Sequence, residues 1–290
     1  MVVASRSIIV VLLCALTAVR AEDLNPLSDE FINMINSKQN SWKAGRNFPV
    51  DTPFSFIKNR LGSLEDEDFA KLPKIKHSAE LIASLPESFD PRDKWPNCPS
   101  LNEIRDQGAC GSCWAFGAVE VMTDRYCIHS SGLKNFHFSA QDLLSCCPHC
   151  GLGCHGGYKN SAWSYFNSTG IVSGGNYNSN QGCRPYEILR GSFYTVSSDE
   201  DQIKAELFQN GPIEAGFDVF LDFATYREGV YRHVDGDYAG GHDVKMLGWG
   251  AENGEKYWLM ANSWNPDWGD KGFFKILRGE NQSCIFINYG

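Results

Sequence analysis

The sequence lacks a second long apolar run, a surplus of basic residues and any internal repeat. Its one long apolar run, residues 7–19, is shorter than the roughly 20 apolar residues needed to cross a bilayer. Val19-Arg20-Ala21 then places small residues where a signal cleavage site needs them, so we predict a signal peptide over residues 1–21. Lys and Arg number 26 against 35 Asp and Glu, and this net charge of −9 argues against nucleic-acid binding. We therefore expect neither a nucleic-acid nor a membrane partner once the signal is removed.

Cysteine is absent from residues 22–84 but occurs eleven times in the whole chain of 290 residues. Such a content is typical of an oxidising compartment. Two glycosylation sequons, at Asn167 and Asn281, have meaning only in a translocated chain. We therefore expect passage through the secretory pathway, with delivery to a lysosome or secretion into an extracellular or digestive lumen.

The most informative segment is residues 107–116, Gln-Gly-Ala-Cys-Gly-Ser-Cys-Trp-Ala-Phe. Its small residues deliver Cys113 to the start of an apolar run, residues 114–121, that predicts a buried helix. A thiol at a helix N-terminus lies in a partial positive charge, which favours the thiolate. A structural disulfide in a small-residue turn accounts for Cys110, but not for two cysteines three apart followed by Trp114. The pattern therefore predicts Cys113 as a nucleophile.

Two candidate partners follow Cys113 within the span of about 130–150 residues that is typical of this kind of nucleophile. His242 follows a glycine turn and opens an apparent strand, and Asn262 ends another apolar strand. An amide oxygen at Asn262 can orient the imidazole, and Trp264 can keep water away from that hydrogen bond. Asn262 alone would be interpreted as a turn residue, and the other six histidines as surface or core residues.

Several further motifs accompany this pattern, in a consistent order. They are residues 27–30, 42–48, 85–90, 103–106, 139–147, 182–186, 262–264 and 267–269. With them, from Leu27 to about Leu277, the chain resembles papain-family cysteine proteases of the cathepsin B-like group. The resemblance implies an α+β, papain-like fold of two lobes, with a helical left lobe over about 85–194 and a β-barrel-like right lobe over about 195–290. The reaction would take place between the lobes.

The same resemblance implies a cysteine-type endopeptidase made as a zymogen. Residues 22–84 would be an inhibitory pro-segment, although their composition alone also fits a flexible linker, and residues 85–290 would be the peptidase domain. The partners would be protein and peptide substrates, the chain's own pro-segment and cystatin-type inhibitors. No cofactor and no metal are expected.

Within the site, the resemblance implies a thiolate–imidazolium pair of Cys113 and His242. The Gln107 side chain would stabilise the oxyanion together with the Cys113 backbone N–H. Gly156 and Gly157 would pair with the substrate backbone, although a simple tight turn also fits them. Trp264 and Asp243 would complete the substrate site.

The resemblance also implies the disulfides Cys98–Cys127, Cys110–Cys154 and Cys147–Cys150. The dense cluster over residues 146–155 could instead be interpreted as a zinc site, which an oxidising lumen disfavours. Three cysteines, Cys146, Cys183 and Cys284, are left over, and the first two of these could bond to each other.

The chain departs from the cathepsin B-like group at two places. The long insertion after residues 182–186, called the occluding loop, is missing, and no histidine lies between His155 and His233. The histidines that anchor a substrate's C-terminal carboxylate are therefore absent, and we expect little dipeptidyl carboxypeptidase activity.

The second departure is Asp243, which follows the catalytic histidine where the group has a small residue, while the short C-terminus lacks the group's acidic residue. Asp243 could restore a negative second subsite that prefers a basic residue two positions before the scissile bond. It could instead raise the pKa of His242, or weaken the site and leave a binding or decoy protein. A transglutaminase-like enzyme is disfavoured because it would carry aspartate in place of Asn262.

Overall fold

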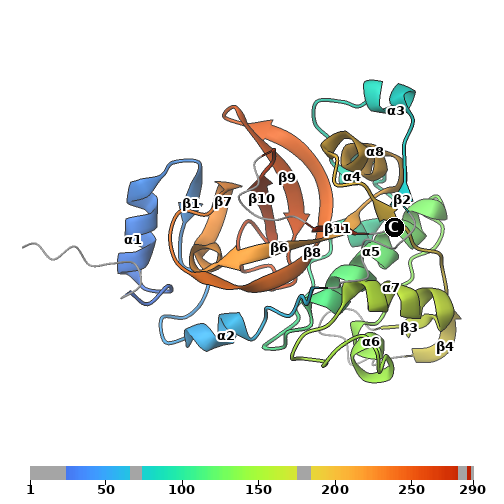
Figure 1. Cartoon of the computed structure of the whole chain (residues 1–290), viewed down its shortest axis with the longest axis horizontal. Coiled ribbons are helices and arrows are strands. Elements are labelled where there is room, and N and C mark those ends of the chain that lie inside the picture. Colours follow the sequence, from blue (N-terminus) through green and yellow to red (C-terminus); the bar gives the residue numbers. More distant parts are fainter. Residues whose placement is uncertain (1–23, 66–73, 175–183, 280–285, 289–290) are drawn as a thin grey trace, which may run out of the picture.

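Two lobes lie side by side in the computed structural model, one built on a large sheet and one on helices (Figure 1). The structure describes residues 24–65, 74–174, 184–279 and 286–288. The expected signal peptide, Cys183, Asn281 and Cys284 lie outside these residues. No helix among the described residues is long and apolar enough to cross a membrane.

The sheet lobe contains a seven-stranded sheet in the order β1-β7-β10-β9-β8-β6-β11. Neighbouring strands run antiparallel except β7 and β10, which are parallel. Aromatic residues fill its core, because large flat rings cover much apolar surface per residue. The strands are β1 (Trp42–Ala44), β6 (Ile213–Phe220), β7 (Tyr226–Tyr231), β8 (Tyr238–Glu252), β9 (Glu255–Ala261), β10 (Phe273–Leu277) and β11 (Phe286–Asn288).

The helical lobe is built around α5 (Cys113–His129). Apolar and small residues occur around most of this helix, and it is buried against α6, α7 and α8 and against the face of β8, together with the polar residues Glu120, Asp124 and Arg125. The other helices are α1 (Asp29–Lys38), α2 (Phe54–Lys58), α3 (Ala79–Ala83), α4 (Pro91–Lys94), α6 (Ala140–Cys146), α7 (Lys159–Ser168) and α8 (Glu200–Asn210), with 3-10 turns at Pro99–Asn102 and Leu221–Thr225. Two short sheets pair β2 (Lys74–Ile75) with β5 (Thr195–Val196) and β3 (Ile171–Ser173) with β4 (Arg184–Leu189).

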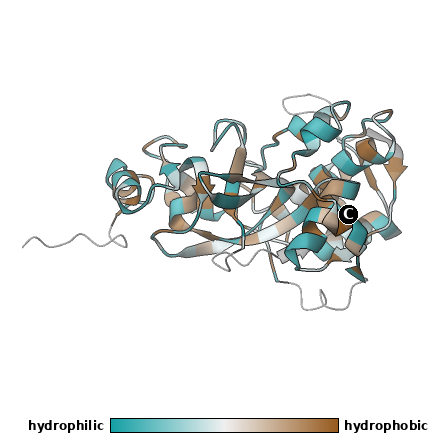
Figure 2. Cartoon of the chain, turned by 90° about the horizontal axis from the view of Figure 1, so that it is seen from above, coloured by the Kyte–Doolittle hydropathy of each residue, from teal (hydrophilic) through white to brown (hydrophobic). Residues whose placement is uncertain are grey.

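The N-terminal segment, by which we mean residues 24–65 and 74–84, has no separate core. Phe31, Ile35 and Trp42 are buried in the same cluster as Phe223 and Trp268 of the sheet lobe. Helix α1 carries both hydrophilic and hydrophobic residues (Figure 2), and Ser28 caps its N-terminus. Strand β1 then adds to the sheet edge at β7. These contacts are not those of a flexible linker.

The strand β8, which His242 was expected to open, does not alternate between buried and exposed residues. Residues 242–250 are all buried, because α5 covers one face of the strand and the aromatic core covers the other. A strand that is covered on both faces has no solvent-exposed side, so burial does not alternate along it.

Three disulfides join Cys98 to Cys127, Cys110 to Cys154 and Cys147 to Cys150, the pairs that the resemblance implies. They consume thiols that the zinc interpretation would need as ligands. Cys146 is exposed, and Cys183, to which it could bond, is not among the described residues.

A buried ion pair joins the two lobes. Lys245 of β8 lies 2.9 Å from a carboxylate oxygen of Asp124 on α5, and their side chains are 1% and 0% exposed. Lys245 also donates to the Ser100 carbonyl. A buried charge depends strongly on its partner, because water cannot replace it.

Replacing Lys245 by methionine should therefore lower the free energy of unfolding by about 3–5 kcal/mol, since Asp124 would remain buried without its cation. Urea denaturation would measure this loss. The double variant Lys245→Met/Asp124→Leu should recover most of it, and Lys256→Met, at an exposed lysine, should stay within about 0.5 kcal/mol of the parent. A single variant as stable as the parent would show that this pair does not hold the lobes together.

Candidate active site

Cys113 is the first residue of α5 and is fully buried. Ser112 precedes it as the N-cap without a side-chain capping bond, so its hydroxyl does not satisfy the N–H groups of the first turn. Those groups provide the partial positive charge expected at this terminus. The disulfide between Cys110 and Cys154, and a backbone bond from Gly111 to the Cys154 carbonyl, fix the approach to the helix.

His242 and Asn262 come together from neighbouring strands. His242 lies on β8, and Asn262 follows the end of β9. The imidazole Nε2–H donates to Asn262 Oδ1 over 2.8 Å, and the Ser263 backbone N–H donates to the same oxygen. The Trp264 ring lies 5.1 Å from the imidazole, centroid to centroid, and is fully buried. This hydrogen bond leaves Nδ1 as the free nitrogen, and it has no partner among the residues described.

The thiol interacts with the residue that follows this histidine. Hydrogen bonding from the backbone N–H groups of Asp243 and Gly62 favours the charged form of the Cys113 thiol, against the effect of burial. The structure therefore brings Cys113, His242 and Asn262 together at the seam between the lobes.

Gln107 is held in one orientation. Its Oε1 accepts a hydrogen bond from the Ser263 hydroxyl over 2.7 Å, which turns Nε2 away from Ser263. Nε2 donates to the Cys110 carbonyl and, over 2.8 Å, to the carbonyl of Arg60 in the N-terminal segment. The Arg60 carbonyl oxygen thus accepts a hydrogen bond from the same Gln107 amide that we expected to stabilise the oxyanion.

The N-terminal segment fills the cleft with extended backbone. The N–H of Gly157 donates to the Gly62 carbonyl over 2.9 Å, and the N–H of Leu64 donates to the Gly157 carbonyl over 3.0 Å. On the opposite wall, Ser63 donates to the Gly241 carbonyl. The fit requires glycine, since a Cβ on Gly62 would lie 2.0 Å from the Gly111 carbonyl oxygen. Gly157 therefore pairs with a peptide backbone, and Gly156 stands next to it with a φ of +105°.

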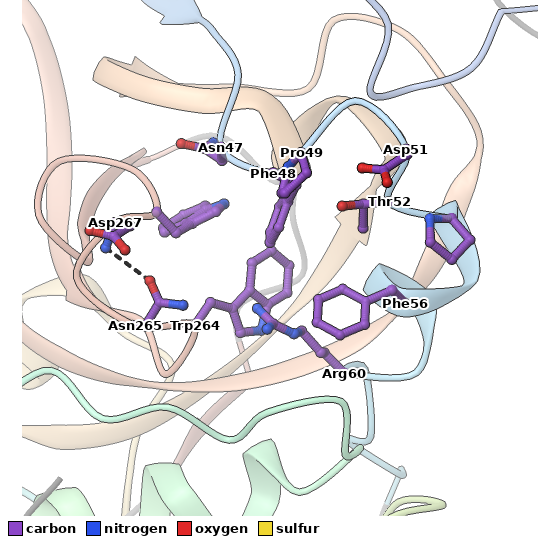
Figure 3. Close-up of a pocket in the computed structure, with 12 residues that line it drawn as sticks. Asn47, Phe48, Pro49, Asp51, Thr52, Phe56, Arg60, Trp264, Asn265 and Asp267 are labelled. Carbon is purple, nitrogen blue, oxygen red and sulfur yellow. Dashed lines mark hydrogen bonds between the residues drawn. The ribbon is translucent and has the colours of Figure 1, made fainter. Parts of the chain in front are cut away.

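Arg60 anchors this segment and was not identified in the sequence. Its side chain lies against Phe56 and Trp264 (Figure 3), with the guanidinium carbon 4.4 Å and 5.8 Å from the ring centroids. Asp106 lies 4.0 Å away, and burial lowers the pKa of the arginine although Asp106 opposes this. The same corner borders a cavity of about 520 Å³ between the segment and the loop after Asn262. The available signal in the sequence was an arginine that follows several phenylalanines, which could have indicated contacts between its guanidinium and their rings.

Covering the cleft keeps the two reactive groups neutral. Burial, and then the charge of Asp243, raises the pKa of the Cys113 thiol to about 12. Burial lowers the pKa of His242 from 6.5 to about 4, although the Asn262 hydrogen bond favours the charged form. The expected thiolate–imidazolium pair is therefore not the state of the covered site, and Asp243 does not bring about a net rise in the pKa of His242.

Asp243 has a partner that the sequence reasoning missed. Lys159, the first residue of α7, lies 3.0 Å from Asp243 Oδ1, and both side chains are buried. Burial would lower the pKa of Lys159, but the charges of Asp243 and Glu214 outweigh it and raise that pKa. Burial and Asp243 raise the pKa of Glu214 well above its ordinary value. Asp243 is thus one member of an ion pair and does not place an uncompensated negative charge in the expected second subsite.

The glycosylation candidate Asn167 lies apart from this site. It is exposed near the end of α7 and donates to the Gly191 carbonyl. The second sequon, at Asn281, is not among the described residues.

Comparison with known proteins agrees with this geometry. Residues 85–289 match the papain family of cysteine proteases, and residues 27–67 match the propeptide of peptidase family C1. A cathepsin B-like cysteine proteinase of Schistosoma japonicum is 39% identical over 309 residues, covering 90% of this chain and 89% of that protein. Cathepsin B-like cysteine proteinase 4 of Caenorhabditis elegans is 39% identical over 323 residues, covering 94% and 96%.

Solved structures of precursor forms are also similar. Procathepsin B S9 from Trypanosoma congolense has a TM-score of 0.80 at 37% identity, with 91% of this chain and 99% of that chain covered. The digestive procathepsin L2 of Tenebrio molitor has a TM-score of 0.72 at 29% identity, with 90% and 88% covered. The chain therefore belongs to the papain family of cysteine proteases, with the α+β two-lobe fold and the propeptide of a cathepsin B-like zymogen.

Proposed function

We propose that this cathepsin B-like protease is an endopeptidase in which Cys113, His242 and Asn262 carry out the chemistry. The observation that supports this most strongly is the 2.8 Å bond from His242 to Asn262, which leaves Nδ1 unpartnered beside a thiol at a helix N-terminus. The pairing of Lys159 with Asp243 also weakens the reason for a decoy protein, because the carboxylate next to His242 is already neutralised.

In the proposed reaction, opening the cleft restores water and lets the thiol proton pass to His242 Nδ1. The thiolate attacks the peptide carbonyl, and the resulting oxyanion accepts from Gln107 Nε2 and the Cys113 N–H. Imidazolium protonates the leaving amine, and an acyl-enzyme remains. Neutral His242 then takes a proton from water, whose oxygen displaces Cys113 and releases the acid. The bond from Gln107 to the Arg60 carbonyl supports the first of these donors.

The domain boundaries fit the same proposal. Removal of residues 1–21 as a signal would be followed by cleavage near Ser84 and Leu85, which would separate an inhibitory segment, residues 22–84, from the peptidase domain, residues 85–290. The substrates would be proteins and peptides, cystatin-type inhibitors could enter the vacated cleft, and the location would be a lysosome or an extracellular lumen.

Replacing Cys113 by alanine should abolish peptide hydrolysis, because no other group can form the acyl-enzyme. Initial rates on a fluorogenic peptide, and labelling by a thiol-directed epoxide, would measure this. Cys146→Ser is the matched control at an exposed cysteine and should keep both signals. Hydrolysis retained by Cys113→Ala would exclude the mechanism.

Acid should open the full-length chain. The imidazole titrates at 6.5 when free and at about 4 when covered, so its contribution to the covered form is complete above pH 6.5 and is lost as the pH falls through about 4. Epoxide labelling of the full-length band should therefore accelerate on acidification over this window. Protonation of the thiolate in acid would by itself slow the labelling. Opening of the cleft and protonation of the thiolate therefore change the labelling rate in opposite directions.

The control for this measurement is the variant Gly62→Ala. Its new Cβ meets the Gly111 carbonyl, so labelling should already be fast at neutral pH. Cys113→Ala would report label on other cysteines. A labelling rate that only falls with acid would contradict coupling between His242 and the cover.

Peptides with a free C-terminal carboxylate should be cleaved no faster than their C-terminal amides. Because no histidine lies between His155 and His233, nothing of the expected kind remains to bind the carboxylate. Mass spectrometry of the products would show internal cuts. Serial release of C-terminal dipeptides, with a clear preference for the free acid, would overturn the assignment as an endopeptidase.

A further inference from the structure

We propose that Lys159 and Asp243 together form a specificity-determining pair that favours an uncharged hydrogen-bonding side chain, such as glutamine or serine, two positions before the scissile bond. This inference rests on the proposed function, because it concerns the substrate of the same cleft. It replaces the expectation, drawn from Asp243 alone, of a preference for basic residues.

The pair lies where a bound peptide passes. Ser63 of the N-terminal segment pairs in register with Gly157, and its hydroxyl lies 3.5 Å from Lys159 Nζ. Asp243 adjoins His242 in sequence, and its backbone N–H and its charge both act on the pKa of the Cys113 thiol. A side chain in the position of Ser63 therefore meets the ion pair within reach of the reacting groups.

The floor beneath the pair is closed. A Cβ on Gly216 of β6 would lie 2.6 Å from Asp243 Oδ1 and 3.0 Å from Lys159 Nζ. The two charged groups thus occupy the space that a larger residue would fill at that position. Because Lys159 and Asp243 are both buried, neither charge is compensated by bulk water.

The unused hydrogen-bonding capacity indicates what the subsite accepts. Asp243 Oδ2 is buried with no hydrogen-bond partner among the described residues, while Lys159 Nζ already donates to a hydroxyl. A carboxamide or hydroxyl can accept from Lys159 and donate to Asp243 at once. An apolar side chain would leave Asp243 Oδ2 without a donor and would remove the hydroxyl that Lys159 Nζ contacts.

Charged side chains are disfavoured in either sign. An arginine would meet the ammonium of Lys159, and a glutamate would meet the carboxylate of Asp243. The pair therefore selects by exclusion as well as by attraction.

The test uses four peptides that differ only at this position, carrying Gln, Leu, Arg or Glu. The processed parent enzyme should cleave the Gln peptide with a kcat/KM about tenfold above the others, the size of one good hydrogen bond to a charged group. A parent that cleaves the Leu or Arg peptide as well as the Gln peptide would overturn the proposal.

Variants of each partner should shift the preference in opposite directions. Lys159→Met should raise the Arg-to-Gln ratio by about tenfold, because Asp243 becomes the only charge, whereas Asp243→Asn should raise the Glu-to-Gln ratio. Ratios within one enzyme cancel differences in active concentration. Lys256→Met is the control and should leave every ratio unchanged; unchanged ratios in Lys159→Met would also overturn the proposal.

Binding separates this inference from the proposed reaction. The same peptides can be titrated against processed Cys113→Ala protein, in which no chemistry occurs. If the parent cleaves no peptide but the Gln peptide binds about tenfold more tightly, the reaction fails and the subsite stands. Equal binding of all four peptides, alongside measurable cleavage, would sink the subsite and leave the reaction intact.

Discussion

The backbone pairing of Gly157 with Gly62 and Leu64 is the contact on which the state of the whole site depends. It carries the N-terminal segment across the seam where α5 meets β8, and it buries both reactive groups at once. Because the pairing uses main-chain atoms, it needs little side-chain recognition, but it does need glycines on the walls. The pairing that we propose for an extended substrate thus holds the N-terminal segment in place.

The seam between the lobes also concentrates buried charge. Lys245 pairs with Asp124 on one side of α5, and Lys159 pairs with Asp243 near its N-terminus. Each pair is costly to desolvate and costly to break, so its value lies in fixing one arrangement of the lobes and not in added stability. The first pair holds β8 against α5, the helix that presents Cys113, and the second holds the same strand against α7.

Local sequence signals were sufficient to predict the helix after Cys113, the strand that carries His242 and the strand that ends just before Asn262, because each has an apolar run with a clear start. The family resemblance supplied the lobes and the disulfide pairs. The role of Lys159 could not be predicted, since α7 shows no pattern that directs its first residue toward β8 across 84 positions of sequence. Arg60 was missed for the same reason, as its aromatic neighbours converge only in the folded chain. Contacts between distant segments set the electrostatics, and these are what single-sequence patterns do not contain.

The neutral state of Cys113 and His242 follows from burial under the N-terminal segment. Protonation of the buried histidine therefore favours removal of that segment. A neutral imidazole is favoured only while water is excluded, so acid acts directly against the covered form through the residue that the cover hides. Asp243 adds to this by raising the pKa of the thiol, although its carboxylate is paired with Lys159. Once the segment leaves, the helix terminus and Asn262 both favour the charged pair, and no opposing charge remains uncompensated. The helix terminus and Asn262, which would stabilise the proposed ion pair, are therefore already in place in the covered chain, where water is excluded.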